Sequence, residues 1–183
     1  MIGVTSSGPP ARHRLKILLL AEEAAGLQML RAIVEGGYTV AAVMTSGADR
    51  PDRASPIRDQ AEQLGCPCWP ARLVKEPGFA QRLRAAGVDL LVNVHSLFLI
   101  PDDVLSTPRL GGYNLHPGPL PEYAGLNAVS WALYRGETRH AVTVHGMVPE
   151  VDAGPIAYQA SFDVEEQDTA LSLSVKWSGR VFP

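Results

Sequence analysis

One short segment concentrates residues that could move a proton and stabilise a negative charge. Asn114 and His116 stand two positions apart at the start of the run Asn114-Leu115-His116-Pro117-Gly118-Pro119-Leu120-Pro121. If this run begins as a strand, the two side chains point to the same side. An amide N–H beside an imidazole can hold a developing oxyanion and transfer a proton. The segment is therefore a candidate catalytic loop.

A carboxylate further along the chain could complete such a site. Asp152 lies in the small-residue turn Glu150-Val151-Asp152-Ala153-Gly154. A buried carboxylate beside a histidine raises the pKa of the imidazole and orients its ring. On residue types and spacing alone, a catalytic set of Asn114, His116 and Asp152 and an ordinary hydrogen-bonded loop histidine both remain open.

Strands and helices that could position these residues alternate along the chain. Continuous apolar runs at 17–21, 38–44 and 88–94 are typical of buried parallel strands, and amphipathic stretches at 22–36, 56–64 and 79–86 predict helices between them. Further on we expect a short helix at 101–105, a strand at 113–116, a helix at 126–134, strands at 142–148 and 155–162 that could pair antiparallel, and a helix at 168–181 with Asp168 as its N-cap.

This alternation predicts an α/β fold with a Rossmann-like, doubly wound and mostly parallel sheet that ends in antiparallel strands. Ligands of such sheets bind at the carboxyl ends of the strands, near the point where the strand order reverses. We therefore expect the site in the loops that follow Val94 and Leu115.

Composition excludes several classes of protein. The 183 residues are 46% apolar and carry a net charge of −3, which argues against disorder and against holding nucleic acid by phosphate neutralisation. No run of 18 apolar residues could span a membrane. Cys66 and Cys68 are too close for an unstrained disulfide and too few for a zinc site, so we expect reduced thiols and a cytoplasmic protein. Residues 1–14 are expected to form a flexible leader.

Common nucleotide and hydrolase motifs are absent from the sequence. The loop after the first predicted strand has Glu22 and Glu23 where a dinucleotide fold would have G-x-G-x-x-G. The chain also has no Walker A motif, no G-x-S-x-G and no H-E-x-x-H.

Three motifs, in order and at matching spacing, resemble those of the folate-dependent formyltransferases. The run 114–121, followed by Tyr123-Ala124-Gly125, is similar to the family's catalytic loop. Val142-Thr143-Val144-His145, with Asp152 seven residues on, is similar to the second motif, and Leu97–Pro101 is similar to the folate-pocket loop. The family includes methionyl-tRNA, glycinamide ribonucleotide and sugar N-formyltransferases.

The resemblance implies a reaction and a role for each residue. Asn114 would hydrogen-bond the formyl oxygen, His116 would donate to that oxygen or shuttle a proton, and Asp152 would tune His116 and help to remove the amine proton. The donor would be 10-formyltetrahydrofolate and the acceptor an amine. No metal is implied, because three polar side chains supply the charge stabilisation.

The resemblance also implies a donor pocket. Its apolar wall would contain Leu97, Phe98, Leu99 and Ile100, for which ordinary core packing is the alternative, and its polar edge would come from Val148, Glu150, Val151 and Asp152. His145, Gly118 and Tyr123 are further candidates to line the site, although His145 could instead only pack beside His116. His95 follows a strand end and could touch the pocket, but we expect a surface or capping role for it. We also expect a solvated His140 and Trp131 in a helix core.

Departures from the family narrow the acceptor. Two glutamates replace a phosphate-binding loop, and the loop at 46–55 is short, which disfavours glycinamide ribonucleotide and tRNA. We expect a catalytic domain at 15–183 that is cut short in its last helix and has no C-terminal tRNA-binding barrel. The expected acceptor is a small amine: an amino sugar, an amino acid or a natural-product intermediate, free or carrier-bound. The enzyme would be a homodimer or part of a larger biosynthetic enzyme. Alternatives are an idle folate- or partner-binding relative, a hydrolase of the donor, and a fragment like methionyl-tRNA formyltransferase.

Overall fold

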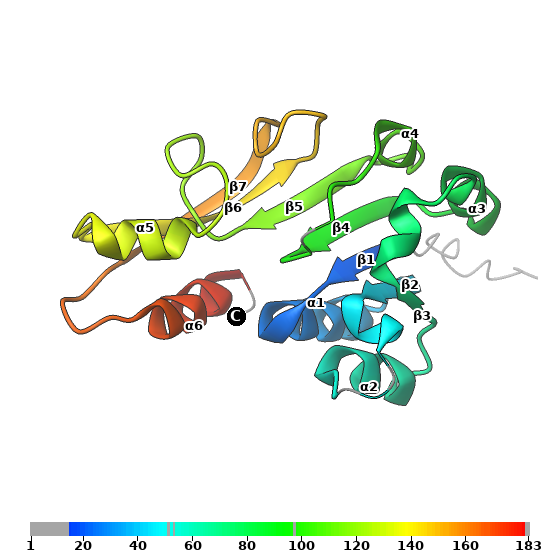
Figure 1. The fold of residues 1–183 in the computed structure, drawn as a ribbon, viewed down its shortest axis with the longest axis horizontal. Coiled ribbons are helices and arrows are strands. Elements are labelled where there is room, and N and C mark those ends of the chain that lie inside the picture. Colours follow the sequence, from blue (N-terminus) through cyan, green and yellow to red (C-terminus); the bar gives the residue numbers. More distant parts are fainter. Residues whose placement is uncertain (1–14, 51, 53, 97, 182–183) are drawn as a thin grey trace, which may run out of the picture.

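The computed structural model describes residues 15–50, 52, 54–96 and 98–181. Its centre is a seven-stranded sheet in the order β3-β2-β1-β4-β5-β6-β7 (Figure 1). The strands are β1 (Lys16–Ala21), β2 (Thr39–Thr45), β3 (Cys68–Pro70), β4 (Leu90–Val94), β5 (Gly112–His116), β6 (Arg139–Gly146) and β7 (Ile156–Asp163). The first five are parallel and the last two pair antiparallel, which confirms the predicted fold class.

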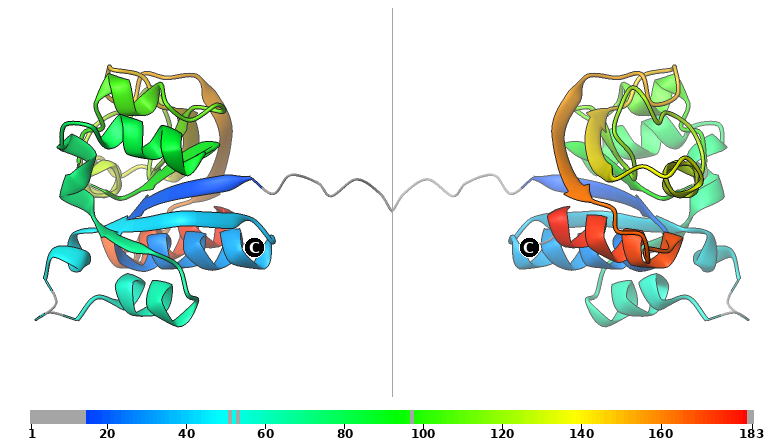
Figure 2. Two further views of the ribbon diagram at one scale, coloured as in Figure 1. Left: turned by 90° about the vertical axis from the view of Figure 1, so that its right-hand side faces the viewer. Right: turned by 90° about the vertical axis from the view of Figure 1, so that its left-hand side faces the viewer.

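Helices cover both faces of the sheet (Figures 1 and 2). They are α1 (Glu23–Glu35), α2 (Pro56–Gln63), α3 (Phe79–Ala86), α4 (Asp102–Leu105), α5 (Ala128–Tyr134) and α6 (Ala170–Val181), with 3-10 turns η1 (Ser46–Asp49) and η2 (Ala71–Lys75). Alternate side chains of β1 enter two cores. Leu19 packs with residues of α1, α2 and α6, whereas Leu18 packs with residues of η2, α3 and α4.

The connection between β1 and α1 consists of Glu22 alone. This tight turn brings α1 close against the sheet, and Gly26 permits that approach: a Cβ on Gly26 would lie 2.7 Å from the Cβ of Ala21. As a result, Glu22 and Glu23 are held at the carboxyl end of the central strand.

The N-terminus of α6 is capped by Thr169 and not, as expected, by Asp168. Thr169 Oγ1 accepts a hydrogen bond from the Ser172 backbone N–H (3.2 Å), and Ser172 Oγ accepts one from the Thr169 N–H (2.9 Å). Asp168 instead accepts from the Glu165 backbone N–H (2.8 Å) and pairs with Lys176 (2.6 Å). These bonds, with one from Ser172, lower the pKa of Asp168 to about 2.

Three further expectations about elements or burial were wrong. Strand β3 was not predicted, because it has only three residues and includes Pro70. Trp131 is 51% exposed rather than in a helix core. His140 is buried rather than solvated: its ring packs edge-on against Tyr123 and Phe162, and its Nε2 donates to the Pro117 carbonyl (2.9 Å).

Candidate active site

A cavity of about 530 Å³ opens at the carboxyl ends of β1, β4 and β5. Strand β1 lies between β2 and β4. The chain first adds β2 and β3 on one side of β1 and then crosses to add β4 on the other side, so the cavity lies where the strand order reverses. Its lining includes the loops expected from the sequence, those after Val94 and Leu115. The lining residues are Glu22, Glu23, Ser46, Asn93, His95, Phe98, Asn114, Leu115, His116, Pro117, Gly125, Leu126, Asn127, Val151 and Asp152.

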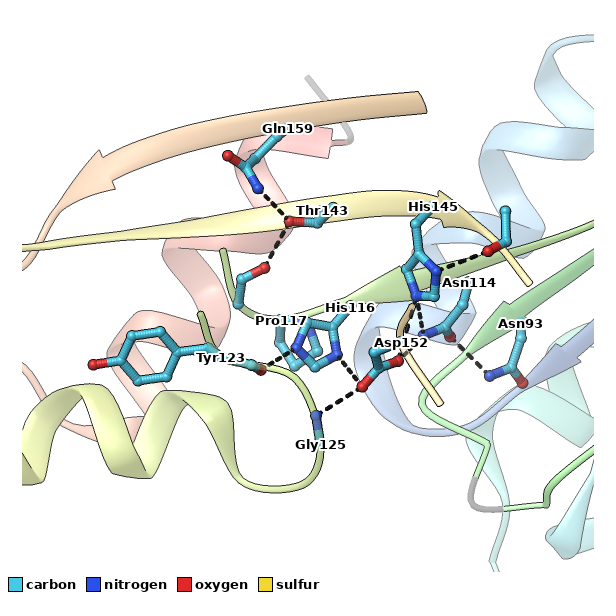
Figure 3. A network of polar contacts seen from close by, with 12 residues as sticks. Asn93, Asn114, His116, Pro117, Tyr123, Gly125, Thr143, His145, Asp152 and Gln159 are labelled. Atoms are coloured by element: carbon cyan, nitrogen blue, oxygen red, sulfur yellow. Dashed lines mark hydrogen bonds and ion pairs between the residues drawn. The ribbon is translucent and has the colours of Figure 1, made fainter. Parts of the chain in front are cut away.

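Sheet register places three polar residues in one row across this end of the sheet. Asn93 of β4 pairs with Asn114 of β5, and Asn114 pairs with His145 of β6. Their side chains are hydrogen-bonded in the same order (Figure 3): Asn93 Nδ2 donates to Asn114 Oδ1 at 2.8 Å, and Asn114 Nδ2 lies 3.1 Å from His145 Nε2. Asn114 Nδ2 also donates to Asp152 Oδ1 at 3.4 Å.

His116 is almost fully buried and is held at both ring nitrogens. Its Nε2–H donates to the Tyr123 carbonyl at 2.7 Å, and its Nδ1 faces Asp152 Oδ2 at 3.4 Å (Figure 3). Burial lowers the pKa of His116, although the charge of Asp152 opposes the shift. The imidazole is therefore neutral near pH 7, with the Nδ1 lone pair available to take a proton.

Asp152 is held ionised among these groups. Its Oδ2 accepts the Gly125 backbone N–H at 2.8 Å, and its Oδ1 lies 3.4 Å from His145 Nε2. Burial alone would raise the pKa of Asp152, but the hydrogen bonds that its carboxylate accepts, including the one from the Gly125 N–H, hold that pKa below its ordinary value. The residue also has a left-handed backbone (φ 54°), so the turn directs the carboxylate inward under strain.

The proline-rich loop supports His116 from behind. Gly118 is required there, because a Cβ would lie 2.9 Å from that of Ala128 and 3.1 Å from His116 Nε2. Thr143 Oγ1 donates to the Gly118 carbonyl at 2.7 Å. Gly118 and Tyr123, expected as lining, are not among the lining residues of the described cavities. They instead pack behind the histidine.

The predicted donor pocket corresponds to an adjoining cavity of about 140 Å³. Phe98, Leu99 and Ile100 line one wall, and His145 also lines the cavity. The other predicted residues, Val148, Glu150, Val151 and Asp152, complete it, whereas Leu97 lies outside the described residues. Phe98 and Ile100 also pack against the core near α3 and α4, so they both line this cavity and contribute to core packing.

A third cavity, of about 630 Å³, shares Glu22, Glu23 and Ser46 with the central one. Glu22 is fixed at its entrance: Oε1 accepts the Ser46 backbone N–H (2.6 Å) and Oε2 accepts the Thr45 hydroxyl (2.9 Å). A carboxylate thus takes the backbone donor that a bound anion would need at this position. Arg50 also lines this cavity.

One lining residue was missed from the sequence, and a second was considered for the pocket but expected elsewhere. Asn93 interrupts a buried apolar strand, a signal that sequence reasoning could have used. His95, for which we expected a surface or capping role, is half-buried and lines the central cavity. Its Nδ1 lies 3.2 Å from Glu23 Oε2, and its ring lies 5.1 Å from that of Trp177.

Within the described ranges, no group of three or more His, Cys, Asp or Glu side chains is arranged to hold a metal ion. None of the helices in the described part of the chain is both long and apolar enough to cross a bilayer.

Solved structures share this fold and the arrangement of its strands. Glycinamide ribonucleotide transformylase 1 from Symbiobacterium toebii is 27% identical, with a TM-score of 0.78 over 93% of this chain and 83% of that one. Phosphoribosylglycinamide formyltransferase from Coxiella burnetii is also 27% identical (TM-score 0.72; 91% and 81% covered). A formyltetrahydrofolate deformylase from Pseudomonas syringae, 22% identical, has the same fold (TM-score 0.75; 93% and 58% covered).

The fold and the polar site thus define a transferase-type α/β domain with its cavity at the strand-order reversal. A family model described as formyl transferase matches residues 18–178. The chain belongs to the formyl transferase family, as the three sequence motifs indicated.

Proposed function

We propose that this protein transfers the formyl group of 10-formyltetrahydrofolate to the amine of a small acceptor, with residues 15–183 as its catalytic domain. The observation that carries the proposal is the cluster of Asn114, His116 and Asp152 where the 140 Å³ cavity meets the larger central one. The donor's pterin would occupy the smaller cavity beside Phe98 and Ile100, and its formyl group would face Asn114.

Asn114 would stabilise the oxyanion. Of its two N–H bonds, the one to Asp152 Oδ1 is the longer at 3.4 Å, so this N–H is the more easily redirected to a formyl oxygen. When the neutral amine attacks the formyl carbon, negative charge develops on that oxygen. A fixed amide donor at this point stabilises the tetrahedral intermediate more than the starting amide.

His116 and Asp152 would remove the proton. The attacking nitrogen becomes cationic and must lose a proton before the intermediate collapses to products. His116 Nδ1 can take it, and the resulting imidazolium would lie 3.4 Å from Asp152 Oδ2. The proton then passes to the departing nitrogen of tetrahydrofolate, so that both the enzyme and the proton count are restored.

The acceptor would bind in the cavity of about 630 Å³ that contains Glu22 and Glu23. These carboxylates favour a neutral or cationic acceptor over a phosphorylated one. Glu22 takes the Ser46 N–H and the Thr45 hydroxyl, and Glu23 adds a second carboxylate at the same entrance. A phosphate beside Glu22 and Glu23 would meet negative charge, and the Ser46 and Thr45 donors at that point are already taken, so Arg50 would be the only cation among the described lining residues to favour it. This separates the proposed acceptor from the phosphoribosyl compound after which the similar enzymes are named.

The test uses three acceptors with the same primary amine: ethylenediamine, ethanolamine and O-phosphoethanolamine. We expect formyl products from the first two with 10-formyltetrahydrofolate, and kcat/KM at least about tenfold lower for the phosphorylated amine. The variant Glu22→Gln should narrow that difference. Formate release at the same rate without any amine would contradict transfer, and preference for the phosphorylated amine would contradict the acceptor class.

A further inference from the structure

Asn93 is a polar residue in an otherwise apolar central strand, and the reaction proposed above does not use it. Its side chain is 8% exposed and lies where the donor cavity and the central cavity meet, because it lines both. Its Nδ2 donates to Asn114 Oδ1 at 2.8 Å, across paired positions of β4 and β5.

A single backbone carbonyl determines the direction of the hydrogen bonds along this row. His145 Nδ1 lies 2.9 Å from the Gly146 carbonyl, which can only accept, so Nδ1 carries a proton. Nε2 can then accept from Asn114 Nδ2, and the same Nδ2 donates to the Asp152 carboxylate, which can only accept. The other end of the Asn114 amide is therefore its oxygen, and that oxygen needs a donor. Asn93 supplies it (Figure 3).

This arrangement leaves Asn93 Oδ1 buried and without a hydrogen-bond partner among the described residues. A buried acceptor without a partner is destabilising, and an apolar side chain of similar size would avoid the penalty. The position is thus poorly suited to stability alone, but it suits a residue needed to orient a neighbour.

We propose that Asn93 is a positioning residue, which fixes the amide of Asn114 so that its N–H bonds, and not its oxygen, face the reacting formyl group. The role rests on the proposed function, because Asn114 is assigned there to the oxyanion. An Asn114 amide turned by 180° would present an acceptor to the oxyanion and would repel it.

Two variants separate positioning from packing. Asn93→Leu removes the donor but fills the space. It should lower kcat about 10- to 100-fold, a larger factor than any change in the Kd for 5-formyltetrahydrofolate, and it should leave the melting temperature unchanged or higher. Asn93→Asp offers only an acceptor to Asn114, so it should turn the amide and lower kcat further. Unchanged kcat in both variants would overturn the proposal.

A double-mutant cycle tests whether the effect passes through Asn114. If it does, Asn93→Leu combined with Asn114→Ala should be no slower than Asn114→Ala alone. Full additivity of the two losses would overturn the proposal.

The ring nitrogens of His145 give a readout that needs no activity. In wild-type protein their ¹⁵N chemical shifts should report a proton on Nδ1. A proton on Nε2 with a bare Nδ1 would mean instead that the Asn114 oxygen faces His145, and it would overturn the positioning role. A wild-type protein that forms no formyl product would overturn the proposed function, and the ring shifts would still decide the orientation of Asn114.

Discussion

The imidazole of His116 can receive a proton only while its Nδ1 is bare. Burial lowers the pKa of His116, so the folded site keeps the ring neutral to a lower pH than a solvated histidine would. We expect kcat, corrected for the fraction of acceptor amine that is protonated at each pH, to stay level down to about pH 6.5 and to fall only below it. A pH–rate profile checks this. An acid limb centred above pH 6.5 would contradict the assignment.

Removing the His116 side chain should affect chemistry more than binding. His116→Ala should lower kcat by about 10²- to 10⁴-fold, because proton transfer loses its acceptor. The Kd for the donor analogue should change less than about threefold, since the donor cavity is lined by other residues. Single-turnover transfer and calorimetry measure the two quantities. Tyr158→Phe, at a half-exposed position on β7, is the control and should behave as wild type.

Sequence reasoning found the residues that carry unusual chemistry but not the one that depends on register. Asn114, His116 and Asp152 stand in motifs whose order and spacing resemble a family. Asn93 belongs to none of these motifs. Its importance follows from the pairing of β4 with β5, and a sequence gives strand periodicity without giving which residues of two strands lie abreast.

At the scale of elements, α6 depends on its cap. Thr169 and Ser172 satisfy each other's backbone N–H groups at the first turn. Thr169→Ala should lower the free energy of unfolding by about 1 kcal/mol. Ser174→Ala is the matched control, because that hydroxyl only bonds back to the Ala170 carbonyl within the helix (2.8 Å) and its loss should be nearly neutral. Urea unfolding of both variants provides the comparison, and equal losses would contradict the capping role.

Trp177 connects α6 to the site. It is 1% exposed, belongs to the core under β1 and β6, and its ring lies 5.1 Å from His95. Trp177→Ala should destabilise the protein by about 3–5 kcal/mol through the lost contacts and the cavity left behind. Thermal or urea unfolding measures this, and a loss below about 1 kcal/mol would show that α6 is not packed as described.

Elements with strong local signals were predicted well, and those that depend on tertiary contacts were not. Strand β1 contains an unbroken apolar run. Helix α3 ends at Gly87, whose left-handed backbone (φ 63°) favours glycine. Helix α5 begins two residues later than expected, because Asn127 is itself left-handed (φ 59°) and cannot continue a helix. Nothing in the sequence around residue 127 indicates that conformation.

At the scale of the whole molecule, two buried histidines couple stability to pH. Burial lowers the pKa of both His116 and His140. Below about pH 6.5 the unfolded chain binds protons at these positions before the folded chain does, so the free energy of unfolding should fall as pH drops from 7 to 5. His140→Gln keeps an N–H donor for the Pro117 carbonyl but cannot titrate. Its stability should therefore decline less steeply with acid, and an unchanged slope would contradict the coupling.

The domain as a whole collects its site from distant parts of the chain. Glu22 follows β1, Asn93 lies on β4, Asn114 lies on β5, and Asp152 comes from the loop between β6 and β7. The alternating strand and helix pattern predicted that these ends meet at one edge, because parallel strands share a carboxyl end. It could not predict that Glu22 would occupy the donors of Thr45 and Ser46, since this depends on side-chain geometry.

The central claim, that a folate donor binds beside Asn114, His116 and Asp152, is tested most directly by calorimetric titration with 5-formyltetrahydrofolate. Wild-type protein should bind one equivalent. Asp152→Ala should weaken binding by about tenfold or more, because the Gly125 N–H would lose its partner and the turn carrying Val151 would loosen. Tyr158→Phe should bind as wild type does. A folded wild-type protein that binds no folate, or one whose affinity is unchanged by Asp152→Ala, would contradict the claim.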